Sequence, residues 1–288
     1  MYAPEFDYYR AGSVSEANDL LRKHPGAKLL AGGHSLIPLL KFRLAAPPVV
    51  IDIGRIRELK GIVANKGSIR IGALTTHAEL ASSAALAEHC PALAEAAAQI
   101  GDPAVRNRGT IGGNVAHADP ASDLPAVLTA LGARFTINGP QGDRVVNADR
   151  FFEGMMTTAL GEHDLLTAIE VPARSAGQGM AYVKFVHPAS RYAVIGVAAA
   201  ITASGGKCTA AAVAVGGLVP RPVRASSVEK ALVGQSLSAE TIAKAAGQIS
   251  QDLGSDILGD IFASAEYRKA VAPVWVRRAL VRAVERAG

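Results

Sequence analysis

The chain has 288 residues, 49% of them hydrophobic and 19% charged, with a formal net charge of +5. This composition supports a buried core. No apolar run approaches the roughly 18 residues of a membrane-spanning helix, so a membrane-embedded protein is excluded. The opening "MYAPEFDYYR" lacks the basic and apolar regions of a secretory signal, and the only cysteines, Cys90 and Cys208, lie far apart, so we expect a cytoplasmic protein without disulfides.

The N-terminal part is predicted to be a small α/β unit. A helix over residues 13–24 begins with Ser13 and Glu16 in capping-box spacing. Strands follow at 27–33, running into a glycine turn, and at 47–54. A strand–helix–strand opening of this kind is typical of an α/β subdomain.

The middle of the chain mixes helices and strands. In chain order we expect a short helix at 55–61, a strand within 67–80 that leads into a helix capped near Thr75 or Thr76, a helix at 86–100 broken by Pro91, a helix at 124–132, a hairpin at 133–146 and a strand at 164–173 ended by Pro172. The small, polar stretch "ARSAGQG", 173–179, is the best candidate for a domain boundary.

The C-terminal part is predicted to keep strands and helices apart. Strands are expected at 180–187, 192–204 and 207–218, and helices at 226–234, 238–250 and 264–286. Three strands followed by helices indicate a segregated α+β domain. The last helix carries Arg278, Arg282 and Arg286 on one face. The scarcity of aromatic residues among these arginines argues against nucleic-acid binding and favours an ordinary surface helix or one that docks a partner subunit.

Two stretches combine paired glycines with hydrogen-bonding side chains, "LLAGGHSLIPLL" at 29–40 and "TIGGNVAHADPASDLPAV" at 110–127. Glycine permits close backbone approach, and successive exposed N–H groups form a concavity suited to phosphate. Thr110 and Asn114 can add side-chain contacts, and Asp123 can accept from a sugar-like hydroxyl. Neither stretch has the G-x-G-x-x-G or Walker A pattern, so we expect a phosphate-bearing cofactor but not a Rossmann site or P-loop.

These stretches, with "IGALTTHAEL", "GDPAVRNRG" and "DLLTAIEVP", closely resemble the FAD-binding medium subunit of molybdenum hydroxylases, the xanthine oxidase family. The nearest branch is the medium subunit of aerobic carbon monoxide dehydrogenases. The resemblance implies an α+β fold, in which residues 1–176 form a PCMH-type FAD-binding domain with subdomains at about 1–56 and 57–176. Residues 177–288 then form a C-terminal domain of antiparallel strands plus helices, of the carbon monoxide dehydrogenase flavoprotein type.

The same resemblance implies which residues hold a non-covalent FAD. They are Ala31, Gly32, Gly33, His34, Ser35 and Leu36 in the first loop; Thr110, Ile111, Gly112, Gly113 and Asn114 in the second; and Asp123, Leu165, Lys184 and Tyr192. Lys184 and Tyr192 match positions near the flavin ring, although a strand lysine that reaches solvent would also explain Lys184, and core packing would also explain Tyr192. The chain departs from the pattern at Arg191, where the carbon monoxide enzymes commonly carry an acidic residue, and this leaves the substrate of the complex open.

The resemblance also implies an electron-transfer role with partners. An iron–sulfur small subunit carrying [2Fe–2S] clusters would deliver electrons from a molybdopterin large subunit, in a dimer of heterotrimers that reduces a quinone or similar acceptor. Carbon monoxide oxidation to carbon dioxide is the first expectation, and an aldehyde, purine or N-heterocycle is the alternative substrate. A peripheral place at the inner face of the membrane would be compatible with a quinone acceptor.

The remaining polar residues indicate no second chemistry. The histidines lack the H-x-x-x-H and H-E-x-x-H spacings of a zinc site, so we expect no metal. His34 and His117 are expected to donate hydrogen bonds around the cofactor, and His77 is left open between that role and a surface position at a helix start. No Ser/His/Asp set or carboxylate pair stands out, so no catalytic residue is expected in this chain. A self-contained flavin oxidase and a nucleotide-binding regulatory module remain as other hypotheses.

Overall fold

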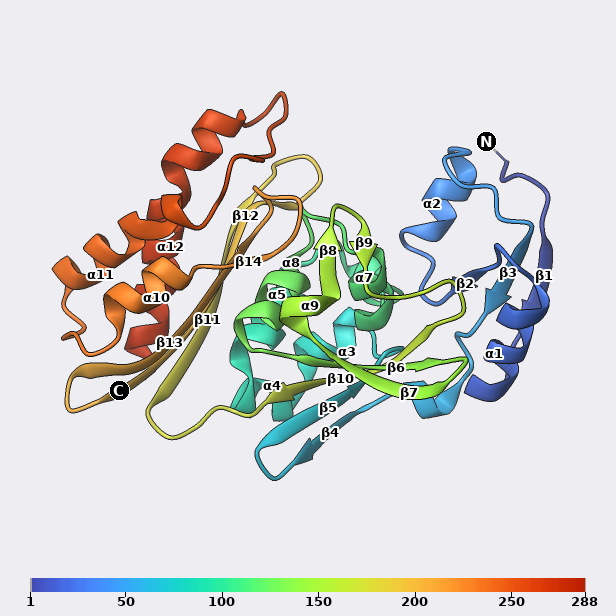
Figure 1. Ribbon diagram of the computed structural model, residues 1–288, viewed down its shortest axis with the longest axis horizontal. Helices are drawn as coiled ribbons and strands as arrows, with labels where there is room; N and C mark the ends of the chain where they lie inside the picture. The colour runs from blue at the N-terminus through green and yellow to red at the C-terminus, as the bar shows by residue number, and fades with distance from the viewer. Residues whose placement is uncertain (1, 288) are drawn as a thin grey trace.

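The computed structural model describes residues 2–287, in which three main sheets follow one another along the molecule (Figure 1). The first sheet is parallel, in the order β1-β3-β2, with β1 at Asp7–Arg10, β2 at Lys28–Leu30 and β3 at Val49–Asp52. Helices α1 (Val14–Lys23) and α2 (Leu36–Lys41) connect its strands. This subdomain has its own small core, which includes Ala17, Leu21, Ile51 and Ile56.

The second sheet is antiparallel, in the order β4-β5-β10-β6-β7. Its strands are β4 (Ile62–Asn65), β5 (Ser68–Gly72), β6 (Arg134–Gly139), β7 (Gly142–Asn147) and β10 (Leu165–Pro172). The accompanying short elements are η1 (Arg57–Leu59), α3 (His77–Ser82), α4 (Ala84–His89), α5 (Pro91–Gln99), α6 (Pro103–Arg106), α7 (Ile111–His117), α8 (Asp123–Ala130), α9 (Ala148–Phe151) and the pair β8 (Phe152–Gly154) and β9 (Thr157–Thr158).

The third sheet, β11-β12-β13-β14, is antiparallel. It consists of β11 (Gln178–Val186), β12 (Ala193–Ser204), β13 (Lys207–Gly216) and β14 (Val223–Arg224), and is followed by α10 (Ser226–Leu232), α11 (Ala239–Ala246), η2 (Gly247–Gln251) and α12 (Ala265–Glu285). The predicted α+β class, with strands before helices in the C-terminal part, is therefore confirmed.

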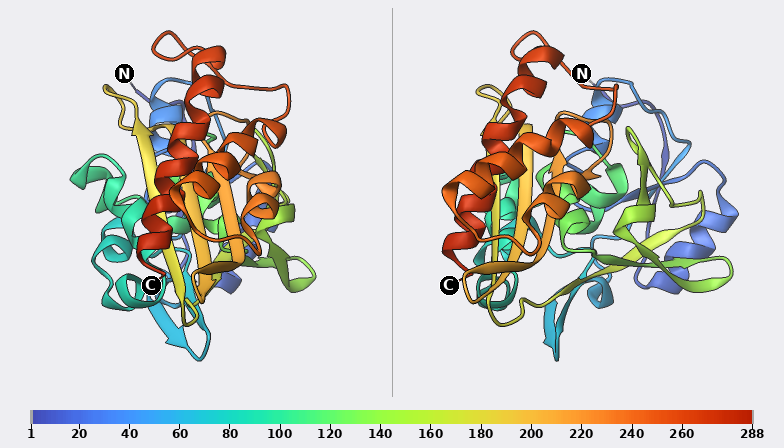
Figure 2. Two further views of the ribbon diagram at one scale, coloured as in Figure 1. Left: turned by 90° about the vertical axis from the view of Figure 1, so that its left-hand side faces the viewer. Right: turned by 60° about the vertical axis from the view of Figure 1, so that its left-hand side comes forward.

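The third sheet is buried on both faces, which explains the nearly continuous apolar run of β12. On one face Tyr182 and Ala198 join the core that contains Leu93 of α5 and Val127 of α8. On the other face Val197 packs with the C-terminal helices. Figure 2 shows these helices lying across the outer side of the sheet. Helices of the second subdomain thus form one side of the C-terminal core, and the two parts share a continuous interior.

Two local predictions differ from the structure. The paired glycines at 112 and 113 do not form a turn: Thr110 is the N-cap of α7, and its Oγ1 accepts from the N–H of Gly113, so both glycines lie in the first helical turn. Glu16 does not complete a capping box with Ser13, because its carboxylate accepts from the N–H of Gly12. The complete capping box lies at Thr76 and Glu79, at the start of α3.

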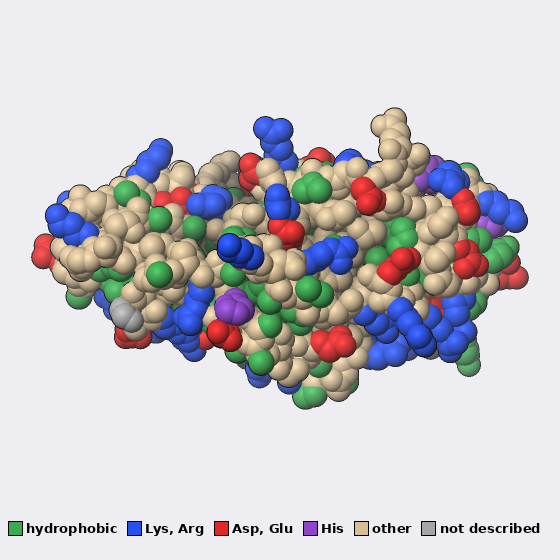
Figure 3. Space-filling view, turned by 90° about the horizontal axis from the view of Figure 1, so that it is seen from below, with side chains coloured by type: hydrophobic (Ala, Val, Ile, Leu, Met, Phe, Trp, Pro, Cys, Tyr) green, Lys and Arg blue, Asp and Glu red, His purple; other side chains and the backbone are tan. Residues whose placement is uncertain are grey.

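Surface charges are unevenly spread. Seen from below, Lys and Arg side chains gather towards the N-terminal end of the molecule (Figure 3). The acidic side chains are spread over the rest of this face and form no comparable group. Within residues 2–287, no helix is long and apolar enough to cross a membrane.

Candidate functional site

A cavity of about 1090 Å³ lies where the first subdomain, the second subdomain and the C-terminal domain meet. Its lining runs from Gly26 and Lys28 beside β2, past the two glycine-containing segments, to residues 189–192 between β11 and β12. Drug-sized ligands occupy pockets of about 300–1,000 Å³, so this cavity is large enough for an extended cofactor.

The first glycine-containing segment forms one wall of the cavity. Gly33 has a φ of +76°, in the left-handed region that favours glycine, and this turns the chain from β2 into α2. Within residues 2–287, the five successive N–H groups of Gly32 to Leu36 have no hydrogen-bond acceptor. Unpaired backbone donors in such a concavity bind anions, and phosphate oxygens are the acceptors they suit best.

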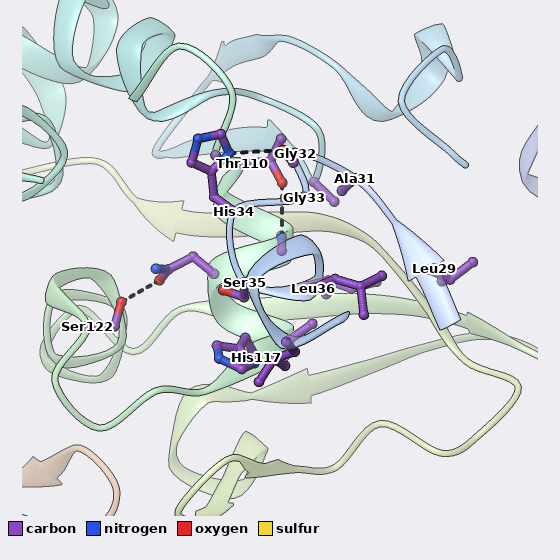
Figure 4. Close-up of a pocket in the computed structure, with 18 of the residues that line it drawn as sticks. Leu29, Ala31, Gly32, Gly33, His34, Ser35, Leu36, Thr110, His117 and Ser122 are labelled. Carbon is purple, nitrogen blue, oxygen red and sulfur yellow. Dashed lines mark hydrogen bonds between the residues drawn. The ribbon is translucent and has the colours of Figure 1, made fainter. Parts of the chain in front are cut away.

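The second segment lies directly against the first. Gly32 has no room for a side chain, because a Cβ there would collide with the backbone carbonyl of Arg108, and a Cβ on Gly113 would come within 3.9 Å of the Cβ of Ala31. Figure 4 shows the two segments side by side, with Thr110 close to Gly32 and Gly33. Paired small residues therefore let the two backbones form one continuous surface.

Asn114 extends this surface with a polar side chain. The hydroxyl of Ser122 donates to its Oδ1 at 2.8 Å, and this contact is drawn in Figure 4. Because Oδ1 is occupied as an acceptor, the amide NH₂ group keeps two donors for a ligand in the cavity.

Asp123 contributes a buried carboxylate to the lining, with a relative exposure of 5%. Its Oδ1 accepts from the hydroxyl of Tyr182 at 2.5 Å and its Oδ2 from Nζ of Lys184 at 2.9 Å. Burial raises the pKa of Asp123, and the Lys184 ammonium and the Tyr182 hydroxyl oppose that rise. The carboxylate is thus held from behind by two donors on β11.

Lys184 does not itself line the cavity. Its side chain is wholly buried, and Nζ also donates to the backbone carbonyl of Gln99 at 3.1 Å. In this geometry Lys184 has no direct contact with the cavity and instead holds the carboxylate of Asp123, which lines it. Ile111 is also absent from the lining and lies completely buried beneath it.

The loop between β11 and β12 borders one end of the cavity. Tyr192 lines it while remaining 48% exposed, and burial, followed by the charges of Asp119 and Asp123, raises the pKa of Tyr192. Arg191 also lines the cavity and has a φ of +61°. It lies so close to Gly101 that a Cβ added to Gly101 would be 2.8 Å from the Cβ of Arg191. Among residues 2–287, this cationic side chain forms no ion pair.

His77 is a cavity residue and not a surface one. It is 4% exposed, and its Nδ1 has no partner within residues 2–287. Burial, with a smaller effect from the neighbouring His34, lowers the pKa of His77 to about 4. The imidazole is therefore neutral at physiological pH, and it can exchange a hydrogen bond with a ligand without adding charge.

The structure brings most of the predicted site residues together. Thirteen of them line the cavity: Ala31, Gly32, Gly33, His34, Ser35, Leu36, Thr110, Gly112, Gly113, Asn114, Asp123, Leu165 and Tyr192. His117 also lines it. The cavity is also lined by residues 100–102, 156–158, 160–162 and 189–190, which the sequence analysis did not name as site residues. Gly101 and Asp102 lie in the stretch "GDPAVRNRG", whereas the others belong to no motif that was recognised. The non-proline cis peptide between Gly101 and Asp102 has no signature in the sequence.

The residues present fit FAD. The unpaired amides of the first segment and the NH₂ of Asn114 suit a pyrophosphate, while Leu29, Leu39, Leu74 and Leu165 supply apolar lining for ring systems. Within residues 2–287, no group of three or more His, Cys, Asp and Glu side chains is arranged to hold a metal ion.

Comparison with known proteins agrees with this geometry. Residues 4–174 match the family model described as the FAD binding domain in molybdopterin dehydrogenase, and residues 180–283 match the CO dehydrogenase flavoprotein C-terminal domain.

Full-length relatives are also found. The carbon monoxide dehydrogenase medium chain of Afipia carboxidovorans is 39% identical over 288 residues, covering 100% of this chain and 99% of that protein. The glyceraldehyde dehydrogenase medium chain of Sulfolobus acidocaldarius is 39% identical over 279 residues, covering 97% and 98%. Among solved structures, a chain of carbon monoxide dehydrogenase from Hydrogenophaga pseudoflava superposes with a TM-score of 0.96 at 42% identity, with complete coverage of both chains.

Proposed function

The chain belongs to the family of FAD-binding medium subunits of molybdopterin dehydrogenases, and on that basis we propose that it holds one FAD in the described cavity and serves as the electron-transfer subunit of a molybdenum hydroxylase. The observation that carries this proposal is the run of five unpaired backbone N–H groups packed against the second glycine segment. When bound, FAD supplies one- and two-electron redox chemistry, and the protein supplies its binding and orientation.

Different residues along the cavity would bind different parts of FAD. The amides of Gly32 to Leu36, with Thr110 and Asn114, would bind the pyrophosphate. Asp123 would accept a hydroxyl hydrogen bond. Tyr192 and Leu165 would contact the ring system from the C-terminal and second-subdomain sides.

We propose carbon monoxide as the substrate of the complex, oxidised to carbon dioxide on another subunit. Support comes from the medium chains of carbon monoxide dehydrogenases, which match this chain over its whole length. The glyceraldehyde dehydrogenase medium chain matches it equally well in identity, so an aldehyde is the main alternative, with purines and N-heterocycles as further ones. Arg191 is a difference from the carbon monoxide enzymes, in which an acidic residue is expected at this position.

The partners we propose are an iron–sulfur small subunit and a molybdopterin large subunit, assembled as a dimer of heterotrimers. This chain has only two cysteines, whereas each [2Fe–2S] cluster takes four ligands, so the clusters would have to lie on another chain. A quinone or similar acceptor would take the electrons. The boundary between the two domains of this chain we place within residues 173–179, between the two matched family models.

Exposed apolar side chains favour a subunit interface on one side of this chain. Helix α2, the β8–β9 turn and the segment before α12 all lie on the upper side of Figure 1. They expose large apolar side chains: Ile37, Phe42, Leu44, Met155, Met156, Ile261 and Phe262. Met156 also lines the cavity. Exposed large apolar side chains on one side of a molecule favour a protein–protein interface there.

The test uses the purified full-length chain, loaded with FAD and assayed for dye reduction with carbon monoxide, glyceraldehyde and xanthine. We expect one FAD per chain and no substrate-dependent reduction by the chain alone. Adding an iron–sulfur small subunit and a molybdopterin large subunit from the same organism should restore reduction with one substrate class. Turnover by the lone chain would refute the relay function and support a self-contained flavin oxidase. Failure to bind FAD would refute the cofactor assignment.

A further inference from the structure

Tyr182 stands out among the buried side chains because its hydroxyl meets the one carboxylate that lines the cavity from α8. Its ring is completely buried on β11, and its hydroxyl lies 2.5 Å from Oδ1 of Asp123. Burial, and the charge of Asp123, raise the pKa of Tyr182 well above its usual value, so the phenol keeps its proton and donates to the carboxylate. A buried tyrosine hydroxyl requires such a partner.

The surrounding strands leave a defined place for this ring. Tyr182 lies two residues before Lys184 on β11, and alternate residues of a strand share a face, so both side chains reach towards α8. Gly196 pairs with Lys184 on the adjacent strand β12. A Cβ on Gly196 would be 2.5 Å from the Tyr182 hydroxyl oxygen and 3.3 Å from Cζ. The missing side chain at 196 therefore makes room for the phenol to reach Asp123.

The backbone of Tyr182 is fixed as well. Its N–H donates to Oε2 of Glu95 at 3.1 Å, and Oε1 of Glu95 accepts from Arg282 and Arg286 of α12. A chain of hydrogen bonds thus runs from the C-terminal helix through Glu95 and Tyr182 to Asp123. Asp123 is the only residue in this series of hydrogen bonds that lines the cavity.

We propose that Tyr182 is a positioning residue of the cofactor site, which fixes the orientation of the Asp123 carboxylate so that its remaining acceptor positions face the ligand. This inference rests on the proposed FAD-binding function. An ionised carboxylate has about four acceptor positions, of which Tyr182 and Lys184 occupy two. Without the phenol, Lys184 alone would hold the group, and the carboxylate could rotate about its side-chain bonds away from the ligand.

The experiment is a double-mutant cycle on FAD binding, measured by fluorescence titration of the full-length apoprotein. We expect Tyr182→Phe to weaken FAD binding by about tenfold, because a hydrogen bond to a buried charged group is lost. In the Asp123→Asn background the same change should weaken binding less than about twofold, because the group that Tyr182 positions is already altered. Tyr267→Phe serves as the matched control, with unchanged affinity, because Tyr267 is half-exposed and its hydroxyl forms no hydrogen bond among residues 2–287.

The outcomes separate positioning from mere packing. Equal weakening in both backgrounds, or none in either, would overturn the proposal, because Tyr182 would then act independently of Asp123. Should Tyr182→Phe fail to fold by circular dichroism, Gly196→Ala displaces the same hydroxyl, and its effect on FAD affinity must likewise disappear in the Asp123→Asn background. If the wild-type apoprotein bound no FAD at all, the proposed function would fail instead, before any variant is compared.

Discussion

The backbone of Gly32 lies directly against the backbone carbonyl of Arg108, so closely that no side chain could stand between them. This contact joins the parallel sheet of the first subdomain to the segment that leads into α7. It creates one wall of the cavity from two parts of the chain that are distant in sequence. Changes in either segment should therefore affect cofactor binding more than they affect the fold.

Gly33→Ala should reduce FAD affinity by at least tenfold. An alanine at φ +76° costs about 1–2 kcal/mol, and its Cβ would lie 2.6 Å from Cδ1 of Ile37, so the Ile37 side chain or the loop itself must shift. The control is Gly67→Ala, at φ +84° in the β4–β5 turn, where a Cβ meets no atom within 4 Å. Both variants should lose stability by urea denaturation because both place alanine at a positive φ, but only the first should lose affinity in a fluorescence titration. Equal affinity in the two would contradict the loop assignment.

The stability of the apoprotein should fall as the pH drops from 7 to 5, in part because of His77. In the folded state its pKa is lowered to about 4 from 6.5, so between these values the unfolded chain binds a proton that the folded chain does not. This contribution is present above pH 6.5 and should amount to about 2 kcal/mol lost by pH 5.

Urea denaturation of wild type and His77→Gln at both pH values measures this contribution directly. The variant should show a smaller decrease in unfolding free energy between pH 7 and 5. His89→Gln, at a partly exposed position whose ring lies 3.8 Å from Glu88, is the control and should retain the wild-type dependence. Identical pH dependence in His77→Gln and wild type would show that His77 is not held neutral by burial.

Glu95→Gln should weaken the attachment of the C-terminal domain. The carboxylate accepts from the Tyr182 N–H with one oxygen and from Arg282 and Arg286 with the other, and an amide can offer only one oxygen. We expect a loss of about 1–3 kcal/mol in unfolding free energy. Glu170→Gln removes a more exposed ion pair with Arg134 and should cost less than about 1 kcal/mol. Thermal and urea unfolding monitored by circular dichroism compare the two, and similar losses would argue against a special role for Glu95.

FAD should be bound without a covalent link. Neither cysteine lines the cavity, and burial raises the pKa of Cys90 to about 12, so that thiol is not available as a nucleophile. Acid precipitation of the reconstituted protein should release all flavin absorbance to the supernatant. Flavin retained on the washed precipitate would contradict this prediction.

The sequence by itself determined most of the local structure and the identity of the two glycine segments. Apolar alternation, Ser13 and Thr76 at helix starts and Pro91 at the break between α4 and α5 act over a few residues, so their effects can be inferred without knowing the fold. The family resemblance then related those segments to FAD. The character of "TIGGN" as a helix start was not foreseen, because paired glycines suggest a turn until Thr110 is seen to cap the helix.

Only the tertiary structure decided how the distant segments meet. The burial of His77, the place of Arg191 against Gly101, and the support of Asp123 by Tyr182 and Lys184 all depend on contacts between elements far apart in the chain. Side-chain burial and the pKa shifts that follow from it arise from what the other parts of the fold place around a residue. For this reason the sequence could select Asp123 and Lys184 separately, whereas the fold alone showed that the lysine reaches the cavity through the aspartate.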